Sequence, residues 1–179
     1  VFDARGNGAS EGRGPFTHEQ WAADVEGLRE WLGVDRIVMA GGSYGGFMAM
    51  EYAIRHPERV AALVLRDTSA DNANQELAMR NALASARVDI DRAKLDRIMS
   101  GTVRDDADLR DCWAEILPLY DHELDWDKVR ARVEGTPYRY ETHNYAFAHN
   151  MPNYDIAPQL GRITCPALSD WPRIRASAA

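Results

Sequence analysis

The chain of 179 residues lacks the features that would place it in several large classes of protein. It has only two cysteines, Cys112 and Cys165, which are too few for a disulfide framework and have no metal-ligand spacing. It has no basic excess, and a net charge of −7 argues against nucleic acid or an anionic membrane surface as a partner. No apolar run approaches the roughly 18 residues of a membrane span. These absences favour a protein with reduced thiols, no membrane segment and a cytoplasmic location.

Short apolar runs alternate with helical patterns in the first third of the chain. Residues 17–32 place apolar side chains on one face of a helix. Residues 36–40 and 60–65 are apolar runs typical of buried parallel strands, and residues 46–56 between them have a helical pattern. Residues 1–2 resemble the end of a further strand. Strands that alternate with helices at this spacing predict an α/β fold with a parallel sheet and right-handed connections.

From about Ser69 the pattern becomes more polar and almost wholly helical. Helices are expected near residues 73–86, 91–99, 105–117 and 125–134. Residues 162–168 then return to strand character, and a helical insertion between two strands of a sheet is the layout of a lid. We therefore expect a partial sheet core over 1–68, a helical lid over 69–158, and a return strand with an irregular tail over 159–179.

The segment Gly41-Gly42-Ser43-Tyr44-Gly45 matches the pattern G-x-S-x-G between a predicted strand and a predicted helix. A sharp turn at this place lifts the Ser43 hydroxyl clear of the sheet, and flanking side chains would collide with the neighbouring strand and helix. The following helix N-terminus favours a developing oxyanion, and the N–H of Tyr44 is the expected first donor. A phosphate-binding turn is the alternative, but neither the Walker nor the dinucleotide pattern fits. The segment predicts Ser43 as a catalytic nucleophile.

Three further segments resemble the α/β-hydrolase fold family. Residues 3–10 match its turn D-x-R-G-x-G-x-S. Residues 55–69, RHPERVAALVLRDTS, resemble the segment after the nucleophile helix of that family. Residues 154–168, YDIAPQLGRITCPAL, resemble the segment that leads into the strand before the catalytic acid. The resemblance implies a partial α/β-hydrolase parallel sheet with a helical lid insertion.

Within this fold the chain is most similar to the proline iminopeptidase group. That group carries G-G-S-W-G at the nucleophile turn, where this chain has Tyr44 in place of tryptophan. Its lid motif is close to E-N-H-Y-F, and the segment ETHNYAF supplies Glu141, His143 and Tyr145, the tyrosine being displaced by one place. The resemblance implies that Glu141 binds the free α-amino group of a peptide through a charge-assisted hydrogen bond. The alternative is that Glu141 is an ordinary exposed residue of the lid.

In this fold the serine is followed along the chain by an acid and then by a histidine. Asp170 is the only carboxylate after the last predicted strand, and Asp67 at the end of strand 60–65 is the alternative acid. All five histidines precede the place where the family has its base: His18, His56, His122, His143 and His149. The catalytic base and the second oxyanion donor are therefore expected to be absent from the sequence given. We expect a fragment of a longer hydrolase that is inactive alone.

The expected function is that of a serine hydrolase, an aminopeptidase that releases N-terminal proline from small peptides. An esterase or lactonase of the same fold is a second hypothesis, and a non-catalytic α/β-hydrolase-like binding protein is a third. The expected partner is a small peptide or ester substrate. No cofactor or metal is implied, and the sequence does not indicate an oligomeric state.

Overall fold

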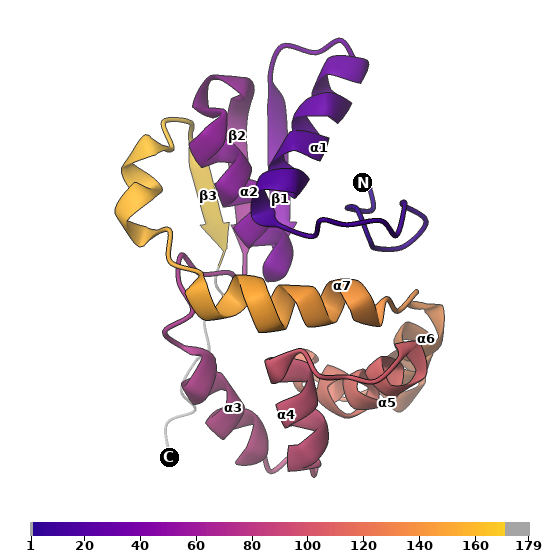
Figure 1. Cartoon of the computed structure of the whole chain (residues 1–179). Helices are drawn as coiled ribbons and strands as arrows, with labels where there is room; N and C mark the ends of the chain where they lie inside the picture. The colour runs from indigo at the N-terminus through magenta and orange to yellow at the C-terminus, as the bar shows by residue number, and fades with distance from the viewer. Residues whose placement is uncertain (1, 171–179) are drawn as a thin grey trace, which may run out of the picture. The chain divides into compact units, whose positions relative to one another are not determined.

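A computed structural model describes residues 2–170 of the chain (Figure 1). The chain divides into two compact units. We call residues 18–71, together with residues 155–170, the sheet unit. Residues 2–17 together with residues 72–154 form the helical unit. Each unit is therefore assembled from two separate stretches of the sequence.

The sheet unit contains three parallel strands in the order β1, β2, β3 (Figure 1). The strands are β1 (Ile37–Gly42), β2 (Val60–Arg66) and β3 (Ala167–Asp170). Helix α1 (His18–Trp31) precedes β1, and α2 (Tyr44–Arg55) connects β1 to β2. The predicted parallel α/β arrangement is confirmed.

Two strand predictions differ from the structure. The strand expected over residues 162–168 begins only at Ala167, because Arg162 ends a 3-10 helix (Ala157–Arg162) and residues 163–166 are irregular. The two residues at the start were expected to end a strand, but Phe2 lies outside every described strand and Val1 lies outside the described residues. In both places an apolar run was too short to distinguish a strand from irregular structure.

Helices α1 and α2 cover one face of the sheet. The core of this unit consists of buried residues from both helices and β2: Ala22, Val25, Ala49, Tyr52, Ala53, Val60 and Leu63. Met39 and Leu65 of the strands pack against this core. Because side chains alternate along a strand, this is the face that carries Leu63. Burial of this face against two helices positions the carboxyl ends of β1 and β2.

The opposite face of the sheet carries exposed apolar side chains. Ala40, Val64 and Leu168 pair across the three strands, and Val38 lies two residues before Ala40. Val38 is 62% exposed and Leu168 is 63% exposed. Parallel sheets are normally covered on both faces. Within residues 2–170, this face remains open to solvent at these positions.

The helical unit contains α3 (Gln75–Leu83), α4 (Arg92–Ser100), α5 (Asp106–Ile116), α6 (Trp126–Gly135) and α7 (Tyr140–Tyr145). Residues Ala146–Asn150 continue beyond α7 as a π-helix. Aspartates explain where three of the helices begin, because the carboxylates of Asp91, Asp105 and Asp125 accept hydrogen bonds from N–H groups of the first turns of α4, α5 and α6. The core of the unit is a cluster of buried residues: Ile90, Leu95, Ile98, Val103, Leu109, Cys112 and Ile116.

The glycine-rich turn near the start of the chain also belongs to the helical unit. Gly8 has a φ of +51°, and a Cβ there would lie 2.1 Å from Oδ2 of Asp3. That carboxylate accepts a hydrogen bond from the N–H of Ala9 at 3.0 Å. The Thr142 hydroxyl of α7 donates to the carbonyl of Gly6 at 2.7 Å. The D-x-R-G-x-G-x-S pattern thus forms a closed turn on which α7 is anchored.

No helix within residues 2–170 combines the length and the apolar character needed to cross a bilayer.

Candidate active site

Ser43 lies in a sharp turn between the end of β1 and the first residue of α2. Its backbone angles are φ 50° and ψ −122°, which only glycine adopts readily. A conformation of this kind costs about 1–3 kcal/mol and persists only where the surroundings enforce it. Ser43 is exposed, and its hydroxyl does not cap α2. The geometry therefore presents this hydroxyl to solvent, as the G-x-S-x-G pattern predicts.

Three hydrogen bonds hold the backbone of Ser43 in this conformation. Its N–H donates to the carbonyl of Arg66 in β2 at 2.9 Å. Its carbonyl accepts from the N–H of Gly46 and from the hydroxyl of Thr68, each at 2.9 Å. Because β2 and α2 both contribute, the strained turn is fixed by the sheet and the helix together.

The glycines around Ser43 do not all serve the same purpose. A Cβ on Gly41 would lie 2.2 Å from the carbonyl oxygen of Gly45, and a Cβ on Gly46 would lie 2.4 Å from the Thr68 hydroxyl oxygen. The expected collision is therefore confirmed at Gly41. At Gly45 the expectation is wrong, because a Cβ there would meet nothing within 4 Å. Instead, the backbone of Gly45 is the group that leaves no room for a side chain at Gly41.

Tyr44 is the first residue of α2, so its N–H lies in the turn whose donors have no acceptor within the helix. Its side chain is anchored in the sheet unit. The phenol oxygen lies 3.0 Å from Nε2 of His18, and the ring packs against Trp21 and Phe47 at centroid distances of 5.7 and 5.3 Å. These contacts fix the residue whose N–H is the expected oxyanion donor.

His18 is buried, and each of its two ring nitrogens has a polar partner. Nε2 contacts the Tyr44 hydroxyl, and Nδ1 lies 3.6 Å from Oε1 of Glu51. Burial lowers the pKa of His18 to about 4, so the imidazole is neutral at pH 7. No histidine within residues 2–170 forms a hydrogen bond with Ser43.

The sheet register brings the candidate acids to the same edge as Ser43. Gly42, Arg66 and Asp170 pair across the three strands, and each is the last residue of its strand. Asp67 directly follows β2, has a φ of 47°, and exposes its carboxylate. Ligand sites of parallel sheets lie at the carboxyl ends of their strands. The backbone thus places Ser43, Asp67 and Asp170 at one edge.

Arg66 was not singled out by the sequence analysis, although it lies at this edge. Its guanidinium lies against the backbone of Gly42, because a Cβ on Gly42 would be 3.3 Å from its Nη2. Its Nε is 3.8 Å from the Asp67 carboxylate, and the side chain is largely exposed. No local sequence signal marks this residue, because its place beside the serine turn follows from the pairing of β1 and β2. The structure therefore adds a positive charge beside the turn.

Glu141 lies in the first turn of α7 in the helical unit. It is exposed and forms no hydrogen bond or ion pair with the described residues. His143 is mostly buried: its Nε2 lies 3.0 Å from the carbonyl of Ile98, and its ring stacks on Phe147 at 4.4 Å. Tyr145 packs edge-on against Phe16 at 6.0 Å. Of the three motif residues, Glu141 therefore has the side chain most accessible to a ligand.

Burial of His143 makes the stability of the chain depend on pH. Burial lowers its pKa from 6.5 to about 4, as it does for His18. Between these values the unfolded chain binds protons that the folded chain does not, so the free energy of unfolding should fall as pH drops from 6.5 to 4. Each histidine contributes at most about 1.4 kcal/mol per pH unit. The carboxylates whose pKa is lowered, such as Glu26 and Asp108, act mainly below this window.

We expect His143→Gln to reduce this pH slope by about half, because His18 still contributes the remainder. Urea unfolding at several pH values between 4 and 6.5 measures the slope. The exposed His122 provides the matched control, and His122→Gln should leave the slope unchanged. An unaltered slope in His143→Gln would show that this imidazole titrates in the folded chain as it does in the unfolded one.

No group of three or more His, Cys, Asp or Glu side chains in the described part of the chain is arranged to hold a metal ion.

Comparison with known proteins places these features in a family. A proline iminopeptidase of Pestalotiopsis fici is 28% identical over 95% of this chain and 64% of its own length. A proline iminopeptidase of Xylella fastidiosa is 44% identical over 37% of this chain and 22% of its own length. A solved structure of a thermophilic esterase from Thermogutta terrifontis is similar with a TM-score of 0.60 and 26% identity, over 93% of this chain and 58% of that chain. This chain thus spans less than two thirds of each relative. A profile of the alpha/beta hydrolase fold family matches residues 1–165, and the chain therefore belongs to that family.

Proposed function

We propose that this chain carries the nucleophile turn of a serine hydrolase that releases N-terminal proline from small peptides. The observation that carries the proposal is the strained and exposed Ser43 at the end of β1. A strained backbone conformation in a residue other than glycine costs free energy, and here three hydrogen bonds from β2, α2 and Thr68 hold Ser43 in that conformation. A turn that only connected a strand to a helix would not need a strained residue other than glycine.

In the proposed reaction, the Ser43 oxygen attacks the carbonyl carbon of the substrate, and the C–O bond forms as the hydroxyl proton passes to a base. The N–H of Tyr44 stabilises the oxyanion. The amine then leaves with that proton, and water hydrolyses the acyl-enzyme. None of the groups that form hydrogen bonds with Ser43 in the described part of the chain is a histidine, so the base must be a further group. Asp170 or Asp67 would orient it from the edge of the sheet.

The substrate class rests on relatives and on Glu141. Two proline iminopeptidases are among the similar proteins, and Glu141 offers an exposed carboxylate with no ion pair among the described residues. A carboxylate of this kind can bind the ammonium group of a peptide N-terminus. The likeness to a solved esterase favours a second candidate, in which the same turn cleaves an ester or lactone without need of Glu141.

The test uses the full native protein with a prolyl arylamide and a p-nitrophenyl ester as substrates. We expect turnover of both, and labelling of Ser43 by a fluorophosphonate probe. Glu141→Gln should lower kcat/KM for the arylamide by about 10- to 100-fold, because a charge-assisted hydrogen bond is lost, and should spare the ester. Glu134→Gln changes another exposed glutamate of the helical unit and serves as the control.

Each other outcome selects a different function. Turnover of esters alone, with no effect of Glu141→Gln, would favour the esterase. Absence of labelling at Ser43 would contradict both enzymatic functions and favour a non-catalytic binding protein.

A further inference from the structure

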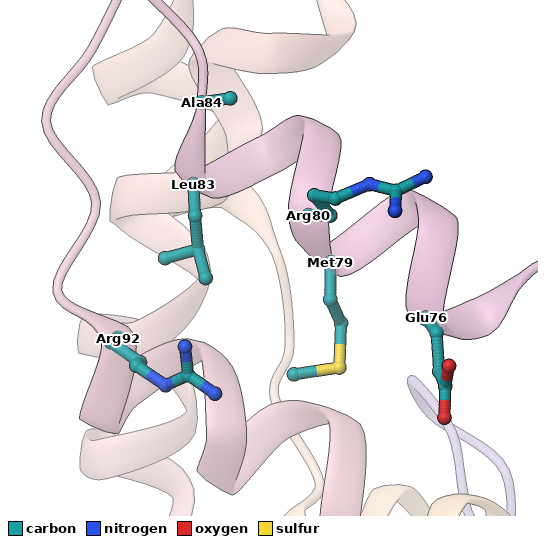
Figure 2. Close-up of a pocket in the computed structure, with 6 residues that line it drawn as sticks. All are labelled: Glu76, Met79, Arg80, Leu83, Ala84 and Arg92. Carbon is teal, nitrogen blue, oxygen red and sulfur yellow. The ribbon is translucent and has the colours of Figure 1, made fainter.

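A hollow of about 500 Å³ opens on the surface of the helical unit between α3 and the start of α4 (Figure 2). It is lined by Glu76, Met79, Arg80, Leu83, Ala84 and Arg92. The first five recur at intervals of three and four residues along α3 and just past its end, so they share one face of that helix. The volume of the hollow falls within the range of small-molecule sites, which is about 300–1,000 Å³.

The floor of the hollow is apolar. Met79 and Leu83 pack against the buried core of the helical unit and are themselves only partly buried. Figure 2 shows both side chains extending from α3 toward the side on which Arg92 lies. Water over a concave apolar surface is displaced favourably by an apolar ligand. The floor therefore suits a short hydrocarbon chain.

One basic side chain beside this floor, that of Arg92, can bind an anion. The guanidinium of Arg92 extends toward the ends of Leu83 and Met79 (Figure 2). Its one ion pair among the described residues joins Nε to Asp96 at 3.5 Å, which leaves the terminal Nη atoms for other acceptors. Arg80 forms no ion pair with the described residues, and Glu76 is the single acidic residue of the lining. The Arg80 guanidinium extends away from Met79 and Leu83 in Figure 2, so Arg92 is the basic group at the apolar floor.

We propose that this hollow binds a small amphipathic carboxylate, with its hydrocarbon chain on Met79 and Leu83 and its carboxylate on Arg92. A guanidinium can donate two parallel hydrogen bonds to a carboxylate, which an alcohol or an amine of the same length cannot accept. The site uses no residue of the Ser43 turn, so it is independent of the proposed hydrolase activity.

Octanoate is the probe, and the full chain is titrated with it by calorimetry while backbone amide shifts are recorded by NMR. We expect saturable binding, with shift changes concentrated at residues 76–84 and at Arg92. Arg92→Gln should weaken the affinity about tenfold or more, because a charge-assisted hydrogen bond is lost. Arg92 is exposed, so this variant should fold. Arg110→Gln removes an exposed arginine of α5 that does not line the hollow, and it should bind octanoate as the unchanged chain does.

Octylamine and acetate test separately whether the carboxylate and the hydrocarbon chain are needed for binding. Octylamine should bind at least tenfold more weakly because it lacks the carboxylate, and acetate because it lacks the chain. Equal binding of octylamine, shifts elsewhere in the chain, or unchanged affinity in Arg92→Gln would each overturn the proposal. Ser43→Ala should bind octanoate normally, so a failed hydrolase assay and a failed binding assay remain distinguishable.

Discussion

Ser43→Ala should abolish fluorophosphonate labelling of the native protein and lower its turnover by about 10⁴-fold or more. The alanine lacks the oxygen that forms the acyl bond, and loss of a serine nucleophile has effects of this size in other hydrolases. Intact-protein mass spectrometry measures the labelling, and arylamide or ester hydrolysis measures the turnover. Retained labelling at another residue would show that the proposed nucleophile is wrong.

A second substitution at the same position separates chemistry from strain. Ser43→Gly also removes the hydroxyl, but glycine adopts a φ of 50° without a steric penalty. We expect this variant to be inactive and yet more stable than Ser43→Ala by about 1 kcal/mol, because the strain is relieved. Urea unfolding of the two variants provides the comparison. Equal stability would mean that the turn stores no strain at this residue.

Gly41→Ala should destabilise the sheet unit by about 3 kcal/mol. The added Cβ would lie 2.2 Å from the carbonyl oxygen of Gly45 and 2.4 Å from its carbonyl carbon, and backbone atoms cannot move aside as a flexible side chain can. The start of α2 would have to shift away from β1, and Ser43 would shift with it. We therefore expect a loss of labelling together with the loss of stability.

Gly45→Ala is the matched control, and it should raise the free energy of unfolding rather than lower it. A Cβ at Gly45 meets nothing within 4 Å, and the residue lies within α2. Replacing a helical glycine by alanine adds about 0.5–1 kcal/mol of stability. If Gly41→Ala and Gly45→Ala destabilised the chain equally, the close contact between the two backbones would not be the reason for glycine at position 41.

The sequence predicted the order of helices and strands because each element has a local signature. Apolar runs with β-branched residues identified β1 and β2, and periodic apolar residues identified α1. The G-x-S-x-G pattern likewise predicted a turn, since a pattern of glycines reports local backbone geometry. The start of β3 was misplaced because Ile163 and Cys165 pack against the core of the sheet unit although residues 163–166 are not in strand conformation.

Features that depend on contacts between distant residues were not predicted. Nothing local to Arg66 indicates that its guanidinium lies against Gly42, because the contact follows from the pairing of β1 and β2. The different roles of Gly41 and Gly45 also depend on a contact, because the backbone of Gly45 lies close to the Cα of Gly41. The hollow beside α3 could not be predicted because one of its lining residues, Arg92, lies on another helix.

The hydrogen bond from Thr142 to Gly6 joins residues 136 positions apart in the sequence. During synthesis, the turn at residues 3–10 must therefore wait for this partner for roughly 7 to 27 seconds, at about 5–20 residues per second. Over that interval the turn lacks the hydroxyl group that holds it to α7. Removal of the Thr142 hydroxyl should loosen this turn in the folded protein as well, because the buried carbonyl of Gly6 would lose its donor.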